Sequence, residues 1–276
     1  WIQDWSEYDF ASLPYERMCS MVGTCKRFLE SLLSPVDTAY RCVAFRAANW
    51  SVSPSNNVIR ALIDHNIKID SSVFKYGRRK GLVSFDYSQA CSPIVPWRVR
   101  KDDMCSRDDS GSLWELPIYS EHRWIGAFVT CNRIFRAVMS LRHKFVRVAR
   151  SSQQNKFHAS HKREGLLLTV APSTQGEGWL ATLFQRHAWK ADFNQCGGKQ
   201  LINAVDRASR TYDSRLDQVL PFTLIGHPKL FTKRNERSLT SFLAHCAQHP
   251  DRFQFDTLSG VTRFVKQWEA HSQGGH

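Results

Sequence analysis

The segment RCVAFRAANWSVSPSNNVIRALIDHNIKIDSS, residues 41–72, indicates the class of fold. RCVAF is a short apolar run that predicts a buried strand. Residues 57–65 have apolar side chains at helical spacing after a Ser/Pro/Ser entry, which is a helix start signal. A second apolar run, IKID, ends at Asp70. Strand, helix and strand within about thirty residues form a βαβ unit, which requires parallel neighbouring strands. The segment therefore predicts an α/β fold.

The same alternation continues on both sides of this segment. The pattern predicts helices over residues 14–33, 128–150, 198–213, 237–249 and 261–270. It predicts strands over residues 113–119, 166–172, 219–227 and 252–258. Residues 75–109 are rich in Gly, Ser, Pro and charged residues, which is typical of a long loop over a functional face. No break in composition divides the chain, so residues 1–276 are expected to form a single domain.

The composition limits the classes of partner and compartment. The net charge of +13 and the pI of about 9.6 favour anionic partners, namely nucleic acid, anionic lipid or acidic glycans, although a solvated cationic surface is an equal alternative. No apolar run approaches the roughly 20 residues needed to cross a bilayer. The eight cysteines include no C-x-x-C pair, and several lie in apolar periodic segments. These features predict a cytoplasmic protein, with peripheral contact to an anionic membrane as an alternative.

Three polar residues end predicted strands, where α/β folds place their chemistry. Arg46 follows VAF, Asp70 ends IKID and His227 follows FTLIG. Pro228 excludes His227 from a regular helix, and an imidazole at a strand exit can act as general acid or base. A carboxylate can orient such an imidazole, and a guanidinium can hold a carboxylate with two hydrogen bonds. The alternatives are a turn histidine, an Asx turn and a surface arginine.

Other motifs are weak or absent. His245 and His249 have the i,i+4 spacing of a zinc-binding helix, but the Glu of H-E-x-x-H is missing, so a solvent-facing helix end is favoured. The sequence contains no G-x-S-x-G elbow, Walker loop or G-x-G-x-x-G motif. A basic nucleic-acid-binding protein would fit the charge, yet no RNP, KH or zinc-finger pattern occurs.

Three stretches resemble a known family when they are taken in order. They are FRAANWSVSPSNNVIRALIDHNIKIDSSVFKYG, ELPIYSE, and TLIGHPKLF with the later FQFDTL, and together they extend from Arg41 to Leu258. They resemble polysaccharide deacetylases of the NodB-homology class, above all the bacterial WalW-like subgroup tied to lipopolysaccharide and exopolysaccharide biosynthesis. The resemblance implies a deformed (β/α) barrel, a divalent metal, usually zinc, and hydrolysis of N- or O-acetyl groups on polysaccharide or lipopolysaccharide sugars.

The resemblance also implies a role for each of the three residues. Arg46 matches the arginine that orients the catalytic aspartate, and Asp70 matches the acid that supports the catalytic histidine. His227 matches that histidine, which protonates the leaving amine or alcohol. Aromatic side chains around the mouth of the site would stack on pyranose rings, with core packing as the alternative for each; the candidates are Trp50, Tyr76, Trp97 and Trp114.

The chain departs from the family pattern in two places. Arg-Ala-Ala-Asn-Trp at Arg46 differs from the commoner Arg-x-Pro-Tyr. The T-F-D-D-like strand and the histidine pair that supply the catalytic base and the metal ligands are absent, and the chain opens at Trp1. The expectation is therefore a barrel that lacks its first strands, no metal ligand within this chain and no activity of the chain alone. A non-catalytic relative that binds a glycan or a partner protein is the alternative.

Overall fold

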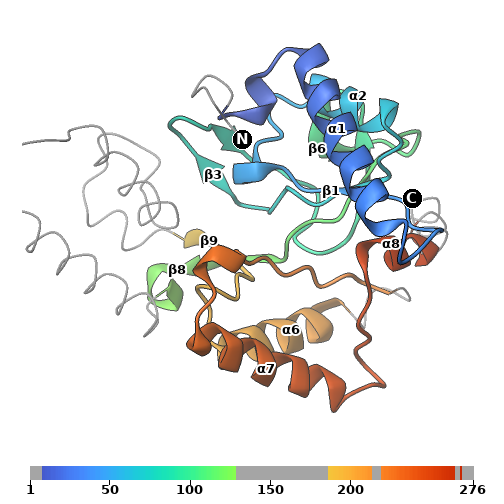
Figure 1. Cartoon of the computed structure of the whole chain (residues 1–276). Helices are drawn as coiled ribbons and strands as arrows, with labels where there is room; N and C mark the ends of the chain where they lie inside the picture. Colours follow the sequence, from blue (N-terminus) through green and yellow to red (C-terminus); the bar gives the residue numbers. More distant parts are fainter. Residues whose placement is uncertain (1–7, 129–185, 213–218, 265–267, 269–276) are drawn as a thin grey trace, which may run out of the picture.

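The computed structural model describes residues 8–128, 186–212, 219–264 and 268 (Figure 1). The predicted strand 166–172 and all but the first residue of the predicted helix 128–150 lie outside these residues. Within them the fold is mixed α/β, with an open sheet flanked by helices. None of the described helices combines the length and the apolar character that crossing a membrane requires.

The βαβ unit forms as predicted. Strand β1 (Ala44–Phe45) pairs in parallel with β2 (Ile69–Asp70), and α2 (Asn56–Asp64) connects them. Strand β7 (Trp114–Glu115) continues the parallel arrangement on the other side of β2. Helix α2 buries one apolar face because its apolar residues recur every three to four positions; the buried residues are Val58, Ile59, Ala61 and Leu62. The carboxyl ends of three parallel strands thus lie at one edge of the sheet.

The prediction of a loop over residues 75–109 is wrong. This part of the chain forms two antiparallel hairpins, whose strands are β3 (Arg78–Arg79), β4 (Phe85–Asp86), β5 (Trp97–Arg100) and β6 (Asp103–Arg107). The five-stranded sheet has the order β1-β2-β7-β5-β6. The strands have two to five residues, too few for a recognisable alternation among the surrounding Gly, Ser and charged residues.

Helix α1 (Tyr15–Leu33) covers α2, while α6 (Gly198–Tyr212) packs on α7 (Lys233–Ala247) in the C-terminal part of the molecule (Figure 1). The predicted helix over 237–249 begins four residues earlier, because Thr232 and Asn235 form a capping box. His245 Nε2 lies 3.2 Å from Asp206 and joins α7 to α6.

The predicted strand over 252–258 is wrong. Residues 253–257 have no regular secondary structure and no ladder partner among the described residues, and Phe255 is 56% exposed. The short helix α8 (Leu258–Val261) follows. Residues 252–258 line a neighbouring cavity instead of joining the sheet.

A separate two-stranded sheet leads to residues 219–227, the segment that the sequence predicts as a strand. Strand β8 (Ser120–Trp124) pairs antiparallel with β9 (Arg186–Lys190). After β9, Asp192 forms an isolated parallel bridge with Ile225, which lies in the predicted strand 219–227. Thr223 of the same segment forms another isolated parallel bridge, with Ile118. These bridges connect the chain after β7 to the chain before His227.

Hydrophobic residues form two large cores. The first lies among α1, α2 and the hairpins, and its fully buried residues include Ile59, Leu62, Met104 and Leu113. The second lies between β9 and the α6–α7 pair, around Trp189, Leu201 and Phe242. A smaller cluster, in which Trp114 contacts Trp268, lies between the C-terminal segment and the sheet. The candidate functional residues lie where the chain passes from the first core to the second.

Candidate functional site

Two of the three residues predicted from the sequence lie at strand ends; the third, His227, follows residues 219–226, where the predicted strand is replaced by two isolated bridges. Arg46 follows β1, Asp70 ends β2 and His227 follows the bridged segment at Ile225. Arg46 Nη1 donates a hydrogen bond of 3.4 Å to the Leu224 carbonyl oxygen. The first and last of these segments, 178 positions apart in the sequence, are therefore within one hydrogen bond of each other.

Arg46 supports the loop after β2. Its Nε donates to the Ser71 carbonyl oxygen at 2.7 Å, and its Nη2 donates to Ser71 Oγ at 2.8 Å. Burial lowers the pKa of Arg46, and the charges of Asp70 and Glu115 oppose that shift. The Arg46 guanidinium thus donates hydrogen bonds to backbone and hydroxyl oxygens. It interacts with the Asp70 and Glu115 carboxyl groups through its charge.

Asp70 and Glu115 form a fully buried carboxyl pair. They are aligned in the β2–β7 register, both are 0% exposed, and each carboxyl group acts on the pKa of the other. Asp70 also accepts from the Ser72 backbone N–H at 3.1 Å and from Ser72 Oγ at 2.8 Å. Glu115 Oε1 accepts from the Val73 N–H at 2.9 Å, while Oε2 has no further partner in the described residues.

Two neighbouring buried carboxylates repel each other, which favours a proton on one of the two carboxyl groups. Burial, and then the charge of Asp70, raise the pKa of Glu115 well above its ordinary value. Burial also raises the pKa of Asp70, but Glu115, Ser72 and Arg46 oppose this shift by stabilising the anion. We conclude that Glu115 is the protonated partner and donates to the Asp70 carboxylate.

His227 lies half-buried beside a different carboxylate. Burial lowers the pKa of its imidazole, and the charge of Asp192 raises it. The positive charges of Lys190, Lys229 and Arg46 lower it further. The imidazole is therefore neutral at pH 7. Asp192 is 1% exposed and follows β9 by two residues, so it meets His227 from the neighbouring segment.

Asn194 fixes the backbone at His227. Its Oδ1 accepts the His227 backbone N–H. Asn235 positions Asn194 in turn, because Asn235 Nδ2 donates to the Asn194 carbonyl oxygen at 3.1 Å. Asn235 is also part of the α7 cap, so the start of α7 positions the histidine loop.

Trp50 and Lys190 form one wall of the site. Lys190 is 6% exposed, and its Nζ lies 3.3 Å from the centroid of the Trp50 ring. The Trp50 ring also meets the His227 ring edge to face, with centroids 6.3 Å apart. Asn49 and Trp50 have φ values of 56° and 57°, in the left-handed region that non-glycine residues rarely adopt. Backbone strain of this kind is concentrated at functional sites.

The other predicted aromatic residues lie elsewhere. Tyr76 stacks on His122 with centroids 4.8 Å apart. Trp97 is 2% exposed and its Nε1 donates to the Met104 carbonyl oxygen at 3.1 Å. Trp114 is 5% exposed. The expected position of Trp97 at the mouth of the site is corrected: it is a core residue of the β5–β6 hairpin, and so it cannot stack on a sugar.

Sequence reasoning missed four residues of the site: Glu115, Lys190, Asp192 and Asn194. Glu115 ends a predicted strand and is in register with Asp70, so its position was a detectable signal. Lys190 ends β9 and Asp192 follows it; the sequence of β9, RHAWK, has cations at both ends and no apolar run. That strand is stabilised by its pairing with β8, which is not encoded locally.

The described residues do not fit the divalent metal that the resemblance implies. In the part of the chain that the structure describes, no three His, Cys, Asp or Glu side chains are grouped so as to hold an ion. Asp70 and Glu115 bind each other. Asp192 accepts from the Asn194 N–H at 2.9 Å and from Gln195 Nε2 at 2.6 Å.

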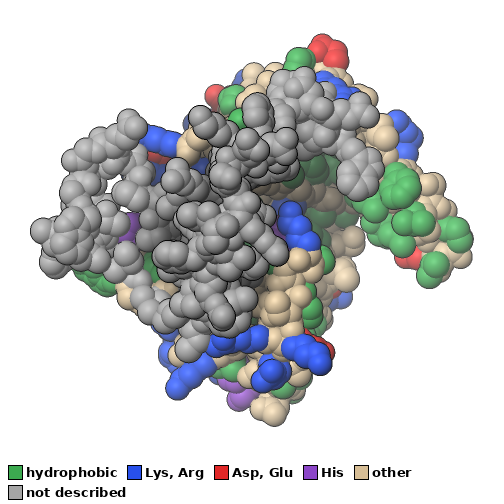
Figure 2. All heavy atoms as spheres, turned by 60° about the vertical axis from the view of Figure 1, so that its left-hand side comes forward, with side chains coloured by type: hydrophobic (Ala, Val, Ile, Leu, Met, Phe, Trp, Pro, Cys, Tyr) green, Lys and Arg blue, Asp and Glu red, His purple; other side chains and the backbone are tan. Residues whose placement is uncertain are grey.

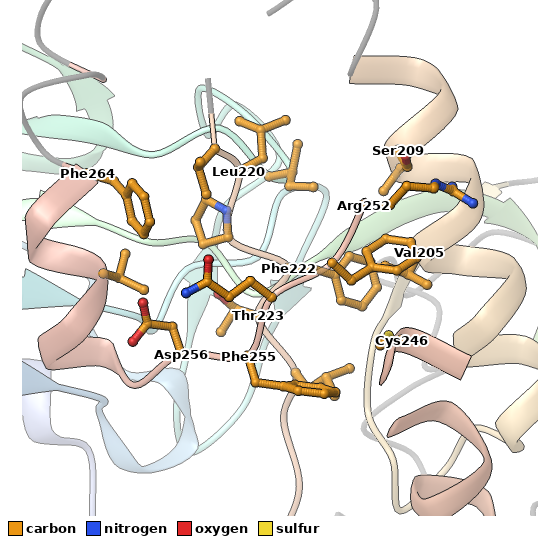
Figure 3. Close-up of a pocket in the computed structure, with 18 of the residues that line it drawn as sticks. Val205, Ser209, Leu220, Phe222, Thr223, Cys246, Arg252, Phe255, Asp256 and Phe264 are labelled. Carbon is orange, nitrogen blue, oxygen red and sulfur yellow. The ribbon is translucent and has the colours of Figure 1, made fainter. Parts of the chain in front are cut away.

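The structure also contains a cavity of about 580 Å³ (Figure 3). Segment 219–224, helices α6 and α7, and the segment before α8 line it. Its walls include the aromatic residues Phe222, Phe242 and Phe255 and the charged residues Arg252 and Asp256. Arg46, Asp70 and His227 are not among its lining residues.

Basic side chains are distributed in separate groups. On the face shown in Figure 2, Lys and Arg side chains lie in several groups separated by other residues, where grey atoms do not cover the surface. This pattern suits a solvated cationic surface as well as contact with an anionic ligand.

Comparison with known proteins gives no relative: no family model, no curated protein and no solved structure matches the chain. Inferences about function therefore depend on the geometry of the site.

The ionisation of His227 can be measured directly. We expect its imidazole to titrate with a midpoint below the ordinary 6.5, because burial disfavours the charged ring. Asp192→Asn removes the charge that raises this pKa, so the midpoint should fall further. The His Cε1–H chemical shift, followed by NMR across pH, checks both statements, with Asp206→Asn as the control. A midpoint above 6.5, or one that Asp192→Asn leaves unchanged, would contradict this assignment.

Proposed function

We propose that the chain is part of a hydrolase that removes acetyl groups from carbohydrates, of the polysaccharide deacetylase type. In this proposal the open sheet belongs to a deformed (β/α) barrel, whose strand ends bear Arg46, Asp70 and His227. The observation that supports it best is the half-buried neutral imidazole of His227, which follows the Asp192↔Ile225 bridge and is acted on by the charge of the Asp192 carboxylate. A positioned imidazole with a pKa close to the working pH is the usual proton carrier in such reactions.

The proposed reaction uses His227 as that carrier. The neutral ring accepts a proton from the water that attacks the acetyl carbonyl carbon. It then delivers the proton to the nitrogen or oxygen of the sugar as the carbonyl–heteroatom bond breaks, which releases acetate. Asp192 stabilises the imidazolium formed between the two steps. Asp192 thus takes the role that the resemblance implied for Asp70.

Arg46 and the carboxyl pair have positioning roles in this proposal. Arg46 donates hydrogen bonds to the carbonyl oxygens of Ser71 and Leu224. These bonds hold the loop after β2 and the segment before His227 together. Asp70 and Glu115 are fully buried and cannot reach a substrate. Because the described donors do not fit a divalent ion, no step is assigned to a metal, and a metal would need ligands from residues beyond those described.

Removal of the His227 imidazole tests the proposal. In the natural gene product that contains this chain, His227→Ala should reduce acetate release from N- and O-acetylated oligosaccharides by at least about 10²-fold, the usual contribution of a positioned acid or base. His249→Ala, two residues after the end of α7, is the matched control and should retain the wild-type rate. Acetate release that His227→Ala leaves intact would exclude His227 from the reaction.

A non-catalytic glycan-binding role is the second candidate. It is favoured by one observation, namely that Asp70 and Glu115 bind each other and so cannot serve as the base that activates water. In that case the natural protein would bind acetylated oligosaccharides, measured by calorimetry, and release no acetate from them.

A further inference from the structure

We propose that the surface beside His227 binds an oxyanion, the carboxylate or phosphate group of an acidic ligand. The proposal depends on the proposed function only in taking that ligand to be a glycan; the binding itself needs no hydrolysis. Three groups would hold the oxyanion: the ammonium groups of Lys190 and Lys229, and the side-chain amide of Asn194.

Lys190 supplies a buried cation at the wall of the site. More than nine-tenths of this residue is buried, and its ammonium group lies 3.3 Å from the centroid of the Trp50 ring and 5.0 Å from that of Phe74. Two aromatic faces attract a cation and exclude water from one side of it. A charge in such a low-dielectric position interacts with a nearby anion more strongly than a solvated lysine does.

Lys229 brings a second cation to the His227 loop. It lies in the turn η5 (Pro228–Leu230), directly after His227, and is exposed. Its charge and that of Lys190 both act on the His227 ring. The imidazole therefore has a cation from the end of β9 and another from its own loop, and an oxyanion between them would be attracted by both.

Asn194 adds a hydrogen-bond donor without a described acceptor. The residue is 1% exposed, and its Nδ2 has no hydrogen-bond partner in the part of the chain that the structure describes. The orientation of the amide is determined, because Oδ1 must face the His227 N–H that it accepts. Nδ2 therefore lies beside His227. A buried donor without an acceptor is destabilising, and an oxyanion at this place would supply the missing acceptor.

The described carboxylates near the ring do not compete for this donor. Asp192 accepts from the backbone of Asn194 and from the Gln195 side chain. Asp70 accepts from Ser72 and Glu115. The net charge of +13 also raises the local concentration of anionic ligands.

Calorimetric titration of this chain with D-glucuronate, inorganic phosphate and neutral D-glucose tests the proposal. We expect one of the two anions, or both, to bind and glucose not to bind. Binding of glucuronate alone identifies a carboxylate ligand, and binding of phosphate alone a phosphorylated one. Lys190→Met keeps the length of the side chain without its charge and should weaken anion binding about tenfold or more. Lys233→Met, an exposed lysine on α7, is the control and should bind as the wild type does.

A second variant keeps the test decisive if Lys190→Met does not fold. Lys229→Glu changes an exposed residue and should weaken anion binding about tenfold or more while the far-ultraviolet circular dichroism is unchanged. Equal binding of glucose and the anions, absence of anion binding to the wild type, or wild-type affinity in Lys229→Glu would each overturn the proposal. A protein that binds anions but releases no acetate would refute the proposed hydrolase and leave this site established.

Discussion

Replacement of Glu115 by alanine is expected to lower the free energy of unfolding by about 3–5 kcal/mol, because it leaves the buried Asp70 charge without its proton-donating partner. Glu115→Gln should cost far less, since its amide can donate to Asp70 and its carbonyl oxygen can still accept from Val73. Urea unfolding of the three proteins measures the difference. The exposed Glu16→Ala serves as the control and should change stability by less than about 1 kcal/mol.

The same pair makes stability depend on pH with a defined sign. The folded chain retains the Glu115 proton above the ordinary pKa of 4.5, whereas the unfolded chain releases it. The contribution is therefore complete below pH 4.5 and is lost as pH rises toward the elevated pKa, at up to about 1.4 kcal/mol per pH unit. Glu115→Gln should remove this decline. An identical pH dependence in the variant and the wild type would show that Glu115 does not hold the proton.

Gly226→Ala is expected to displace the backbone next to His227 and so to disrupt the site. A Cβ at Gly226 would lie 1.8 Å from the Phe193 ring, so either the ring or the segment before His227 must move. Overpacking of this kind costs about 1–3 kcal/mol, and here it displaces the residue that precedes His227. Urea unfolding and the His227 NMR signals measure the two effects.

Gly197→Ala is the matched control, because a Cβ there meets nothing within 4 Å. Phe193→Leu combined with Gly226→Ala should recover part of the lost stability by making room for the added methyl group. If Gly226→Ala were as stable as Gly197→Ala and left the His227 signals unmoved, the close packing of Phe193 on this segment would be refuted.

The elements that depend on local sequence were predictable. The βαβ unit over residues 41–72 forms because its helix and strands have clear periodicity, and α6 has the expected range for the same reason. The hairpins between residues 75 and 109 were not predictable because their strands have only two to five residues. Strand β9 was not predictable because its stability comes from pairing with β8, a segment distant in sequence. The burial of Trp97 is a consequence of the β5–β6 hairpin and could not be known without it.

The site was partly predictable for a similar reason. Arg46, Asp70 and His227 were identified because each ends an apolar run, and a strand end is a feature of the local sequence. Their actual partners follow from the register and the bridges between segments. Glu115 meets Asp70 through the β2–β7 register, and Asp192 meets His227 through a single bridge near Ile225. Sequence alone paired Asp70 with His227, whereas Asp192 is the carboxylate whose charge acts on the ring.

The rate of acetate release from acetylated oligosaccharides by the natural gene product, with and without His227, tests the central claim most directly. We expect the wild type to release acetate, His249→Ala to match it and His227→Ala to fall by at least about 10²-fold while its circular dichroism is unchanged. Acetate release at the wild-type rate by His227→Ala, or none from any acetylated carbohydrate by the wild type, would contradict the proposed function.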